Sequence, residues 1–557
     1  MKPNQIRIVL LVVLAFIFTI LYGKWNTMFP EKSKNPAPVS QQETKQTSTI
    51  PKIQTQSDKQ NTKKLPLKLD TRSEIKNPIK ILTDVFKVEI NPVNGVVSNL
   101  KLLKYSKSLK DKSPLNLLSD SEGQLYLVQS GIINSKLNKN PIYFKTENTT
   151  YSMGDKKTLK VTLSANVDGL DISKTFIFTK GSYNIKVIQS VKNNTSKDFV
   201  GRFYGQILRK DNLESKSMLD VHSYATFTGA TLSSTGDKYQ KESYKNIKEA
   251  SQNIQTTQGW ASMVQHYFIS AWVPENATQG NKNTLFTRYL GDDLYTAGAA
   301  MPTFTIKPGE SSSDSSQLYV GPTIKTNLDQ VAPNLSLTVD YGWLWFISDI
   351  IFWAMSLIYH VVGNWGVAII LVTFLIKLIF YPLSAKSYRS MAKMRLLQPK
   401  IKQLKEHYGD DKQKMTQQMM QMYKREKVNP VGGCLPMIVQ IPVFIALYWV
   451  LLESVQLRQA PFIFWIHDLS VKDPYYILPI LMGLSMFAQQ RLNPAPPDPM
   501  QAKIMMFMPV IFTVMFLNFP SGLVLYWLTN NILGITQQWW VMKQVENEKP
   551  RYKSNKN

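Results

Sequence analysis

A single lysine lies inside the most apolar stretch of this chain. Residues 364–383 read NWGVAIILVTFLIKLIFYPL, and Lys377 is their only charged residue. A helix of this length reaches about 30 Å, the thickness of the hydrocarbon core of a bilayer, so the stretch is typical of a membrane span. A lysine well inside a span costs about 3 kcal/mol and needs water or a polar partner. Either Lys377 faces a polar cavity between helices, or its side chain snorkels toward the basic loop that follows.

No carboxylate in the other apolar segments offers Lys377 a partner, since Glu453 lies only at the end of one. Uncharged polar residues do occur inside the apolar segments: Thr373, Gln440, Thr529, Asn530 and Asn531. Such residues either join helices by hydrogen bonds worth about 0.6 kcal/mol each, or line a hydrated groove that opens to the cytoplasm. Both interpretations stay open at this point.

Basic residues alternate across the apolar segments, which predicts the topology. The stretch 384–430 has 12 Lys and Arg against 4 Asp and Glu, whereas 453–475 has 2 against 3. By the positive-inside rule the first stretch is cytoplasmic and the second is outside, and both termini are cytoplasmic. The expected spans are an uncleaved anchor (1–23), 364–383, 430–452, 476–491, 504–519 and 523–542.

Shorter segments connect or flank these spans. Residues 340–363 are rich in Trp and contain Asp349, which favours an amphipathic helix on the outer surface over a span. Residues 384–429 predict a cytoplasmic helical hairpin whose methionines either pack between its helices or present a soft binding surface. The remaining parts are an outer loop (453–475), a cytoplasmic loop (492–503) and a basic cytoplasmic tail (543–557).

Between the first two spans lies a long hydrophilic region. Residues 24–78 are rich in Lys, Gln, Ser, Thr and Pro and predict a disordered linker. Residues 79–339 contain many short alternating runs, such as TLKVTLSA (158–165) and ISKTFIFT (172–179), separated by turn signals. They predict a large antiparallel β-sandwich outside the cytoplasm. The chain has one cysteine, so the sandwich has no intramolecular disulfide.

Motifs of nucleotide, metal or cofactor chemistry are missing from the sequence. There is no GxxxxGK[ST] and no HExxH, and the five histidines form no ligand cluster. We therefore expect no cofactor, no metal and no enzymatic activity. The net charge of +26 is concentrated partly in the hairpin, which lacks the interleaved aromatic residues of nucleic-acid binders. A solvated or ribosome-facing surface is favoured there, and no DNA binding is expected.

Several long strings resemble one known family. They include YGWLWFIS (341–348), GNWGVAIILVTFLIKLIFYPL (363–383), EKVNPVGGCLPMIVQIPVF (426–444) and FMPVIFTVMFLNFPSGLVLYW (507–527). They closely resemble the YidC/Oxa/Alb family of membrane protein insertases, in its Gram-negative form. The resemblance implies a periplasmic β-supersandwich and a five-helix core with a cytoplasm-facing hydrophilic groove. It also implies ATP-free insertion and folding of inner-membrane proteins, alone or with the Sec translocon.

The resemblance also implies functional residues and partners. The expected partners are nascent membrane proteins, the Sec translocon, the lipid bilayer and, weakly, the ribosome through the hairpin and the tail. Lys377 matches a basic groove residue that is usually arginine in bacteria, which is a departure because lysine cannot grip a carboxylate with two parallel bonds. The expected groove residues are Lys377, Thr373, Gln440, Tyr526, Trp527, Asn530 and Asn531. The expected hairpin contacts are Met391, Met394, Arg395, Met419 and Met422.

Two other functions are compatible with parts of the sequence. A secondary transporter would also place a charge inside the membrane, but the chain shows no internal repeat of the kind that many transporters have. A sugar-processing enzyme in the β domain would rest on analogy between folds alone.

Overall fold

The computed structural model describes most of the chain after the linker. It covers residues 77–547 except 122, 136, 212–225, 276, 409–410, 427, 429–434 and 494–498. The chain divides into two compact units, 1–46 and 47–557, and all described residues belong to the second unit. The expected anchor (1–23), nearly all of the linker (24–78) and residues 548–557 of the tail lie outside the described residues.

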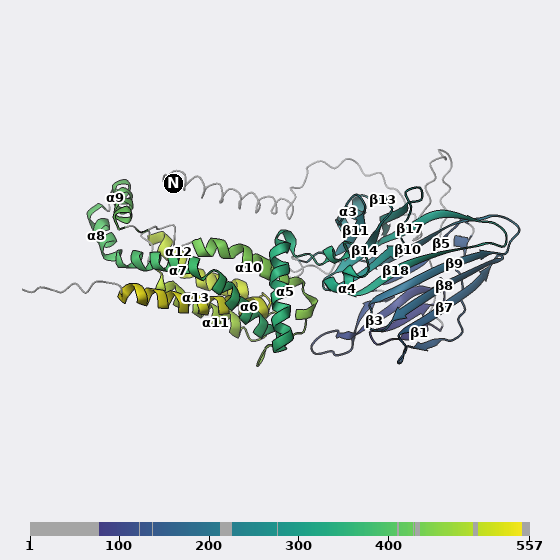
Figure 1. The fold of residues 1–557 in the computed structure, drawn as a ribbon, viewed down its shortest axis with the longest axis horizontal. Coiled ribbons are helices and arrows are strands. Elements are labelled where there is room, and N and C mark those ends of the chain that lie inside the picture. The colour runs from purple at the N-terminus through teal and green to yellow at the C-terminus, as the bar shows by residue number, and fades with distance from the viewer. Residues whose placement is uncertain are drawn as a thin grey trace, which may run out of the picture. The chain divides into compact units, whose positions relative to one another are not determined.

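Two β-sheets form the N-terminal half of the described chain (Figure 1). The ten-stranded sheet has the order β13-β16-β17-β10-β5-β3-β2-β1-β6, with β4 paired to β3, and the eight-stranded sheet has the order β12-β11-β14-β15-β18-β9-β8-β7. Strands β10 and β17 of the first sheet pack against β14 and β15 of the second. Neighbouring strands are antiparallel except β1 and β6, which pair in parallel. The sandwich expected from the alternating runs is therefore present, with one parallel pair at an edge.

The strand bounds follow the alternation of buried and exposed side chains. In β7, for example, Leu159, Val161 and Leu163 point into the core while their neighbours face outward. The ten-stranded sheet consists of β1 (Ile79–Leu82), β2 (Phe86–Asn91), β3 (Val96–Ser106), β4 (Pro114–Leu118), β5 (Tyr126–Ile133), β6 (Thr150–Ser152), β10 (Phe199–Lys210), β13 (Asn253–Thr256), β16 (Asn283–Gly291) and β17 (Leu294–Ile306). The eight-stranded sheet consists of β7 (Thr158–Val167), β8 (Leu170–Thr179), β9 (Asn184–Asn193), β11 (Gly229–Ser234), β12 (Gln240–Ser243), β14 (Gly259–Gln265), β15 (Phe268–Pro274) and β18 (Ser311–Pro322).

Two of the contacts that join the sheets in the core involve a small residue and a buried cation. Trp272 of β15 is fully buried against Gly205 of β10, where a Cβ atom would lie only 1.9 Å from the indole Cε2. Lys174 of β8 is 2 % exposed, and its ammonium donates to three carbonyl oxygens. Two belong to Asn94 (3.0 Å) and Gly95 (3.2 Å) in the turn between β2 and β3, and the third to Ser130 of β5 (2.8 Å). Both contacts hold the two sheets against each other.

Helices make up the C-terminal half. Short helices α4 (Lys325–Asp329), η2 (Leu335–Thr338) and η3 (Gly342–Leu344) lead from the sandwich, while η1 (Leu137–Lys139), α3 (Tyr244–Glu249) and η5 (Val455–Leu457) lie in loops. The long helices are α5 (Trp345–Val362), α6 (Trp365–Ile379), α7 (Tyr381–Leu396), α8 (Gln398–Tyr408), α9 (Lys412–Arg425), α10 (Leu435–Glu453), α11 (Ile477–Leu492), α12 (Pro499–Phe516) and α13 (Ser521–Asn547). Helix α13 packs against α6, α7 and α11, and α5 packs against α6 and α10.

The stretch 364–383 is not one straight helix. Asn364 caps α6, its side chain accepting a hydrogen bond from the backbone N–H of Val367 at 3.1 Å. The helix ends at Ile379, four residues before the expected end, and α7 leaves at an angle of 69°. Pro382 lies at the start of α7, where its missing N–H interrupts the hydrogen bonds of a continuing helix. Lys377 therefore lies within one turn of a bend.

Length and apolar composition mark few of the described helices as membrane spans. One helix, Gly342–Val362, is long and apolar enough, and the bent pair α6 and α7 would count as a second; Ile438–Glu453 and Ala502–Phe516 are shorter apolar helices. The number of six spans therefore stays a prediction. The helix that passes this test is the one expected on the outer surface, and its Asp349 pairs with Lys325 of α4.

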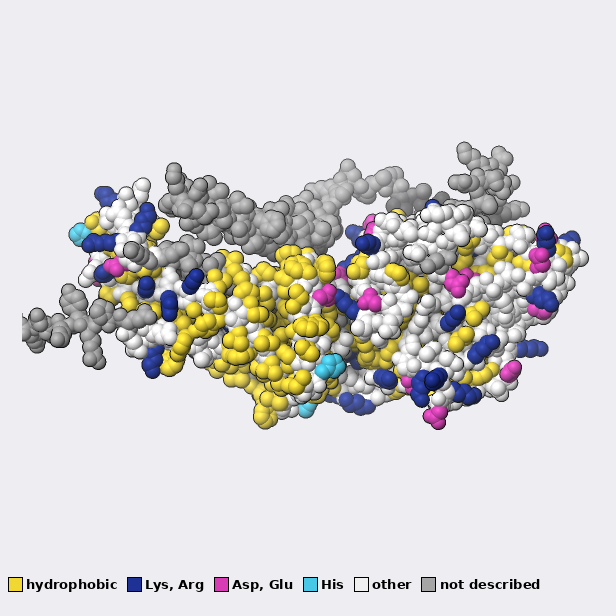
Figure 2. Space-filling view, viewed as in Figure 1, with side chains coloured by type: hydrophobic (Ala, Val, Ile, Leu, Met, Phe, Trp, Pro, Cys, Tyr) yellow, Lys and Arg dark blue, Asp and Glu magenta, His cyan; other side chains and the backbone are white. Residues whose placement is uncertain are grey.

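Side-chain character differs between the parts of the surface. Figure 2 shows hydrophobic side chains gathered over helices α5, α6 and α10–α13 on the viewed face, and Lys and Arg gathered over α7–α9. The exposed apolar residues include Phe374 and Leu378 on α6, Ile480 and Leu484 on α11, and Phe507 and Ile511 on α12. Contiguous apolar surface on this scale indicates a nonpolar environment around these helices.

Candidate functional site

The side chain of Lys377 enters the helix bundle beside a glycine of α13. A Cβ atom at Gly534 would lie 3.5 Å from the Lys377 Nζ, 3.4 Å from Gln489 Nε2 and 3.6 Å from the Tyr388 hydroxyl. Gly534 therefore provides the space in which side chains from α6, α7 and α11 converge. Within the part of the chain that the structure describes, Lys377 forms no ion pair.

A small cavity lies next to this cation. Its volume is about 10 Å³, and its walls are Ile376, Lys377, Phe380, Leu383, Ser384, Val439 and Gln440. This is about the space that one water molecule needs. The polar wall atoms come from α6, α7 and α10, and no carboxylate is among the lining residues. An anionic group that reached this cavity would meet an uncompensated positive charge.

Polar residues of α13 link it to two neighbouring helices. Asn530 accepts a hydrogen bond from Gln440 of α10, and Asn531 donates to Ser485 of α11 at 2.9 Å. Of the residues expected in the groove, Lys377 and Gln440 line one cavity, Asn530 is bonded to Gln440, and Asn531 points to α11. These hydrogen bonds join helices, and of the bonded residues only Gln440 also lines the cavity beside Lys377.

Three expected groove residues have other surroundings. Thr373 is 1 % exposed and donates its hydroxyl to the Ile369 carbonyl of its own helix at 2.6 Å. Tyr526 is 1 % exposed and stacks on Phe444 of α10 at 6.1 Å between ring centroids. Trp527 contacts the same Phe444 edge-on at 4.8 Å. In this structure these three side chains pack between helices and do not line the cavity beside Lys377.

The segment expected to form a hairpin (384–429) contains three helices, because α7 and α8 are separate. Leu397, between them, is buried with Tyr423 of α9 and Val428. Three methionines pack against this cluster, as expected if they lie between the helices of the hairpin: Met394, Met419 and Met422. Met391 is partly buried and Arg395 is exposed. Three of the five expected hairpin contacts therefore serve the packing of the hairpin itself.

Sequence reasoning missed three residues around Lys377. Ser384 and Tyr388 lie on α7, seven and eleven residues after Lys377, and Gln489 lies on α11. The signal for Ser384 and Tyr388 was their helical spacing from Lys377, which the bend at Phe380 partly preserves. Gln489 was visible as an amide near the end of an apolar stretch.

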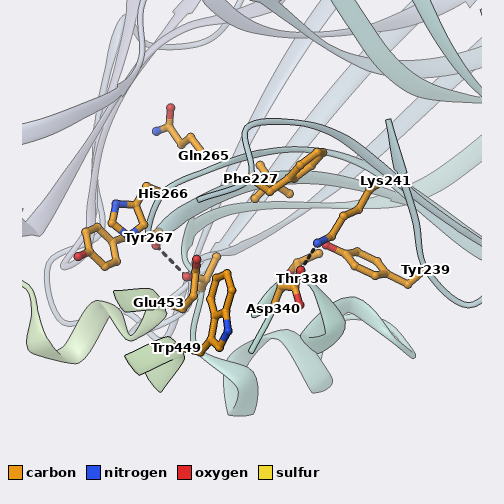
Figure 3. Close-up of a pocket in the computed structure, with 12 residues that line it drawn as sticks. Phe227, Tyr239, Lys241, Gln265, His266, Tyr267, Thr338, Asp340, Trp449 and Glu453 are labelled. Carbon is orange, nitrogen blue, oxygen red and sulfur yellow. Dashed lines mark hydrogen bonds and ion pairs between the residues drawn. The ribbon is translucent and has the colours of Figure 1, made fainter. Parts of the chain in front are cut away.

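A second cavity lies where α10 meets the sandwich (Figure 3). Its volume is about 90 Å³. Lys241 and Asp340 form an ion pair on one side, and Trp449 and Glu453 of α10 lie across from His266 and Tyr267. Next to it, His266 Nε2 lies 2.9 Å from the Leu452 carbonyl oxygen, which only accepts, so this nitrogen carries the proton.

Neither cavity has the residues of a metal centre. Among the described residues, no group of three or more His, Cys, Asp or Glu side chains could hold a metal ion. The chemistry these cavities offer is charge and hydrogen bonding.

Two family models together match nearly all of the described chain. Residues 78–354 match the YidC periplasmic domain, and residues 357–549 match the 60Kd inner membrane protein. Whole relatives match as well. The membrane protein insertase YidC of Francisella philomiragia subsp. philomiragia is 49 % identical, over 98 % of this chain and 99 % of its own length. The insertase of the same name from Francisella tularensis subsp. tularensis is also 49 % identical, with the same coverage.

Solved structures show weaker overall likeness. An active YidC insertase crystal structure with the first transmembrane domain resolved superposes with a TM-score of 0.38 and 16 % identity, covering 83 % of this chain and 92 % of that one. A galactose mutarotase-like protein from Lactobacillus casei has a TM-score of 0.31 and 9 % identity, covering 44 % of this chain and 99 % of that one. At these scores neither superposition carries a functional argument.

Proposed function

Because the chain belongs to the YidC family of bacterial membrane protein insertases, we propose that it inserts nascent proteins into the inner membrane through the polar site around Lys377. The β domain lies in the periplasm, and helices α6 and α10–α13 form the core that contacts the substrate. No nucleotide is hydrolysed. The protein works alone or beside the Sec translocon, and its basic hairpin and tail contact the ribosome.

The observation that carries this proposal is the uncompensated charge of Lys377. Its ammonium enters the bundle next to Gly534 and the amide of Gln489, and the cavity beside it has no acidic wall. A buried cation without a counter-ion is unfavourable on its own, so it is expected to serve a ligand of opposite charge. The hydrophilic segment of a substrate, with its carboxylates, is such a ligand.

The cavity in this structure is far smaller than a peptide segment. Holding a substrate therefore requires α10 and α13 to separate, breaking the hydrogen bond between Gln440 and Asn530. Interhelical hydrogen bonds are worth about 0.6 kcal/mol each on average in membranes. Separating α10 from α13 also breaks the contacts of Phe444 with Tyr526 and Trp527, and aromatic pairs are worth about 0.5–1.5 kcal/mol each. Opening is thus inexpensive compared with the free energy that substrate binding and insertion release.

Hydrophobic partitioning supplies the driving force. A substrate helix of about 20 apolar residues gains roughly 0.3–0.6 kcal/mol per residue on entering the bilayer, which exceeds the transient cost of moving one or two charges across. The apolar surfaces of α10 and α12 provide a path along which this helix enters lipid. The polar site only has to lower the barrier for the hydrophilic segment.

Insertion into proteoliposomes without ATP tests the role of Lys377. The substrate is a small membrane protein with a short acidic translocated segment, and protease protection measures its insertion. We expect Lys377→Arg to retain insertion, because the charge remains, and Lys377→Leu to lose it. Lys386→Leu is the matched control, since Lys386 is an exposed lysine on α7.

Two outcomes would refute the proposed role. Wild-type insertion by Lys377→Leu would mean that the charge does not act on substrates. Equal loss of insertion in Lys377→Leu and Lys386→Leu would mean that apolar substitution in this region is harmful whatever its place. A substrate whose translocated segment carries no acid should depend less on Lys377, and this comparison separates charge attraction from general damage.

A further inference from the structure

A third cavity lies on the opposite side of the core from the hairpin. It has a volume of about 370 Å³, large enough for a small polar group with part of its attached chain. One wall is the loop after β3, residues 107–110, and the other is the segment between α10 and α11. Tyr267, from the turn between β14 and β15, completes the lining.

The charged residues of the lining are mainly cationic. Lys107, Lys110 and Arg458 line the cavity, against one carboxylate, Asp468. Asp468 is 7 % exposed, and its Oδ1 already accepts hydrogen bonds from the backbone N–H and the hydroxyl of Ser470, at 2.8 Å and 2.6 Å. Lys107 also has the exposed Asp111 at 3.8 Å. The charge balance favours an anion inside this cavity.

Arg458 is held in place by main-chain atoms of the sandwich. Its Nη2 donates to the carbonyl oxygens of Ser106 at 2.8 Å and Lys107 at 3.1 Å. Among the described residues, its Nε and Nη1 have no hydrogen-bond partner. A guanidinium positioned in this way keeps donors for a ligand oxygen, and guanidinium groups bind phosphate oxygens well.

The cavity lies at the level of the helix ends. Helix α10 ends at Glu453 and α11 begins at Ile477, and the lining residues 458–471 belong to the segment between them. Exposed apolar side chains lie in this segment and at the start of α11: Ile463, Phe464, Val471, Tyr475 and Ile477. A helix end with exposed aromatic and aliphatic residues is typical of the headgroup region of a bilayer.

We propose that this cavity binds the phosphate of an anionic phospholipid in the outer leaflet of the inner membrane. Lys107, Lys110 and Arg458 contact the phosphate oxygens, and Val471 lies on the side from which acyl chains extend. The bound lipid then joins the β domain to the loop between α10 and α11. This rests on the placement of α10 and α11 in the bilayer, and it is independent of the role of Lys377.

The test uses the purified full chain in detergent and isothermal titration calorimetry. The probes are dihexanoyl phosphatidylglycerol, dihexanoyl phosphatidylcholine and inorganic phosphate. We expect the double variant Lys107→Gln/Lys110→Gln to bind phosphatidylglycerol about tenfold more weakly, because two exposed charge-assisted contacts are lost. The matched control is Lys104→Gln/Lys112→Gln, which removes two exposed lysines near the same loop that do not line the cavity.

Each outcome decides the assignment. Weaker phosphatidylglycerol binding in the first double variant alone supports it. Equal weakening in both double variants would replace it with a general surface-charge effect. Phosphatidylcholine binding as tightly as phosphatidylglycerol would remove the preference for an anionic lipid, and inorganic phosphate binding equally tightly would make the ligand a free anion. Lys377→Leu should bind phosphatidylglycerol like the wild type. The lipid-binding measurement therefore tests the cavity even if the insertion proposal fails.

Discussion

Replacing Lys174 by methionine should make the stability of the β domain depend differently on pH. The ammonium of Lys174 is buried between the sheets and donates to three carbonyl oxygens, those of Asn94, Gly95 and Ser130. Methionine fills a similar volume but leaves these acceptors without their donor. A neutral lysine amine has two N–H donors, so it pairs with two of these acceptors. An unpaired buried acceptor costs at least about 1 kcal/mol, so the loss is about 2 kcal/mol when the lysine is neutral in both the folded and the unfolded state.

The pKa of Lys174 gives the sign of the pH effect. Burial lowers this pKa from 10.5 to about 7. Between these values the unfolded chain binds one more proton than the folded chain, so the free energy of unfolding of the wild type rises with pH. The burial of Lys174 destabilises the folded domain most below pH 7, and this destabilisation disappears near pH 10.5. The methionine variant has no titratable group at this position. The pH effects of all other groups are the same in both proteins and cancel when their free energies of unfolding are subtracted.

The magnitude follows from this pKa difference. The stability gap is the free energy of unfolding of the wild type minus that of Lys174→Met. Between about pH 7.5 and 9.5 this gap should rise by about 2.5 kcal/mol, at 1.36 kcal/mol per pH unit of differential protonation. The gap should be negative near pH 7.5, because desolvation of the buried ammonium there outweighs its hydrogen bonds, and positive once the lysine is neutral in both states.

Urea unfolding of the fragment 78–339 measures the gap, with fluorescence of the buried Trp260 and Trp272 as the probe. Lys186→Met is the control, since Lys186 is exposed on β9 and its replacement should change the free energy of unfolding by less than about 0.5 kcal/mol. A gap that stays constant from pH 7.5 to 9.5 would show that Lys174 remains charged in the folded domain and would refute the reasoning.

Two further predictions concern glycines that admit a neighbouring side chain. Gly205→Ala should destabilise the β domain by about 3 kcal/mol, because its Cβ would lie 1.9 Å from the Trp272 indole. Thermal unfolding measures this loss of stability. The control is Gly280→Ala, whose Cβ would meet no atom within 4 Å. Gly534→Val should displace the Lys377 ammonium and reduce insertion as much as Lys377→Leu does, whereas Gly534→Ala should be tolerated, since its Cβ contacts of 3.4–3.6 Å are ordinary ones. Normal insertion by Gly534→Val would argue against the position assigned to the ammonium.

Much of the β domain follows from local pattern. The run ISKTFIFT alternates as a strand with one buried face, and β8 has this form. The same alternation places Lys174 in phase with the buried Ile172 and Phe176, so the sequence contained a signal for a buried cation. The three carbonyl oxygens that hold it could not be anticipated, because they come from turns and strands distant in sequence.

The helical half was less predictable, since its site depends on bends and on neighbours. Pro382 in the apolar stretch was a sign that α6 would end early, but the angle of 69° depends on packing. Thr373 was expected in the groove because it lies one turn before Lys377, and Tyr526 because of the resemblance, but both side chains are buried between helices. A span's sequence shows where a polar residue lies along the axis more reliably than which neighbour it faces.

The joint between the sandwich and the helices has a consequence for how these parts change during evolution. Arg458 donates to the carbonyl oxygens of Ser106 and Lys107, and His266 donates to that of Leu452. Main-chain carbonyls are present whatever the side chain, so substitutions at positions 106, 107 and 452 leave these acceptors in place. Only substitution of the donors, Arg458 or His266, therefore removes these hydrogen bonds. The attachment of the loop after β3 to the helices therefore places no demand on the side chains of that loop, and the demand on Lys107 and Lys110 comes from the proposed phosphate site alone.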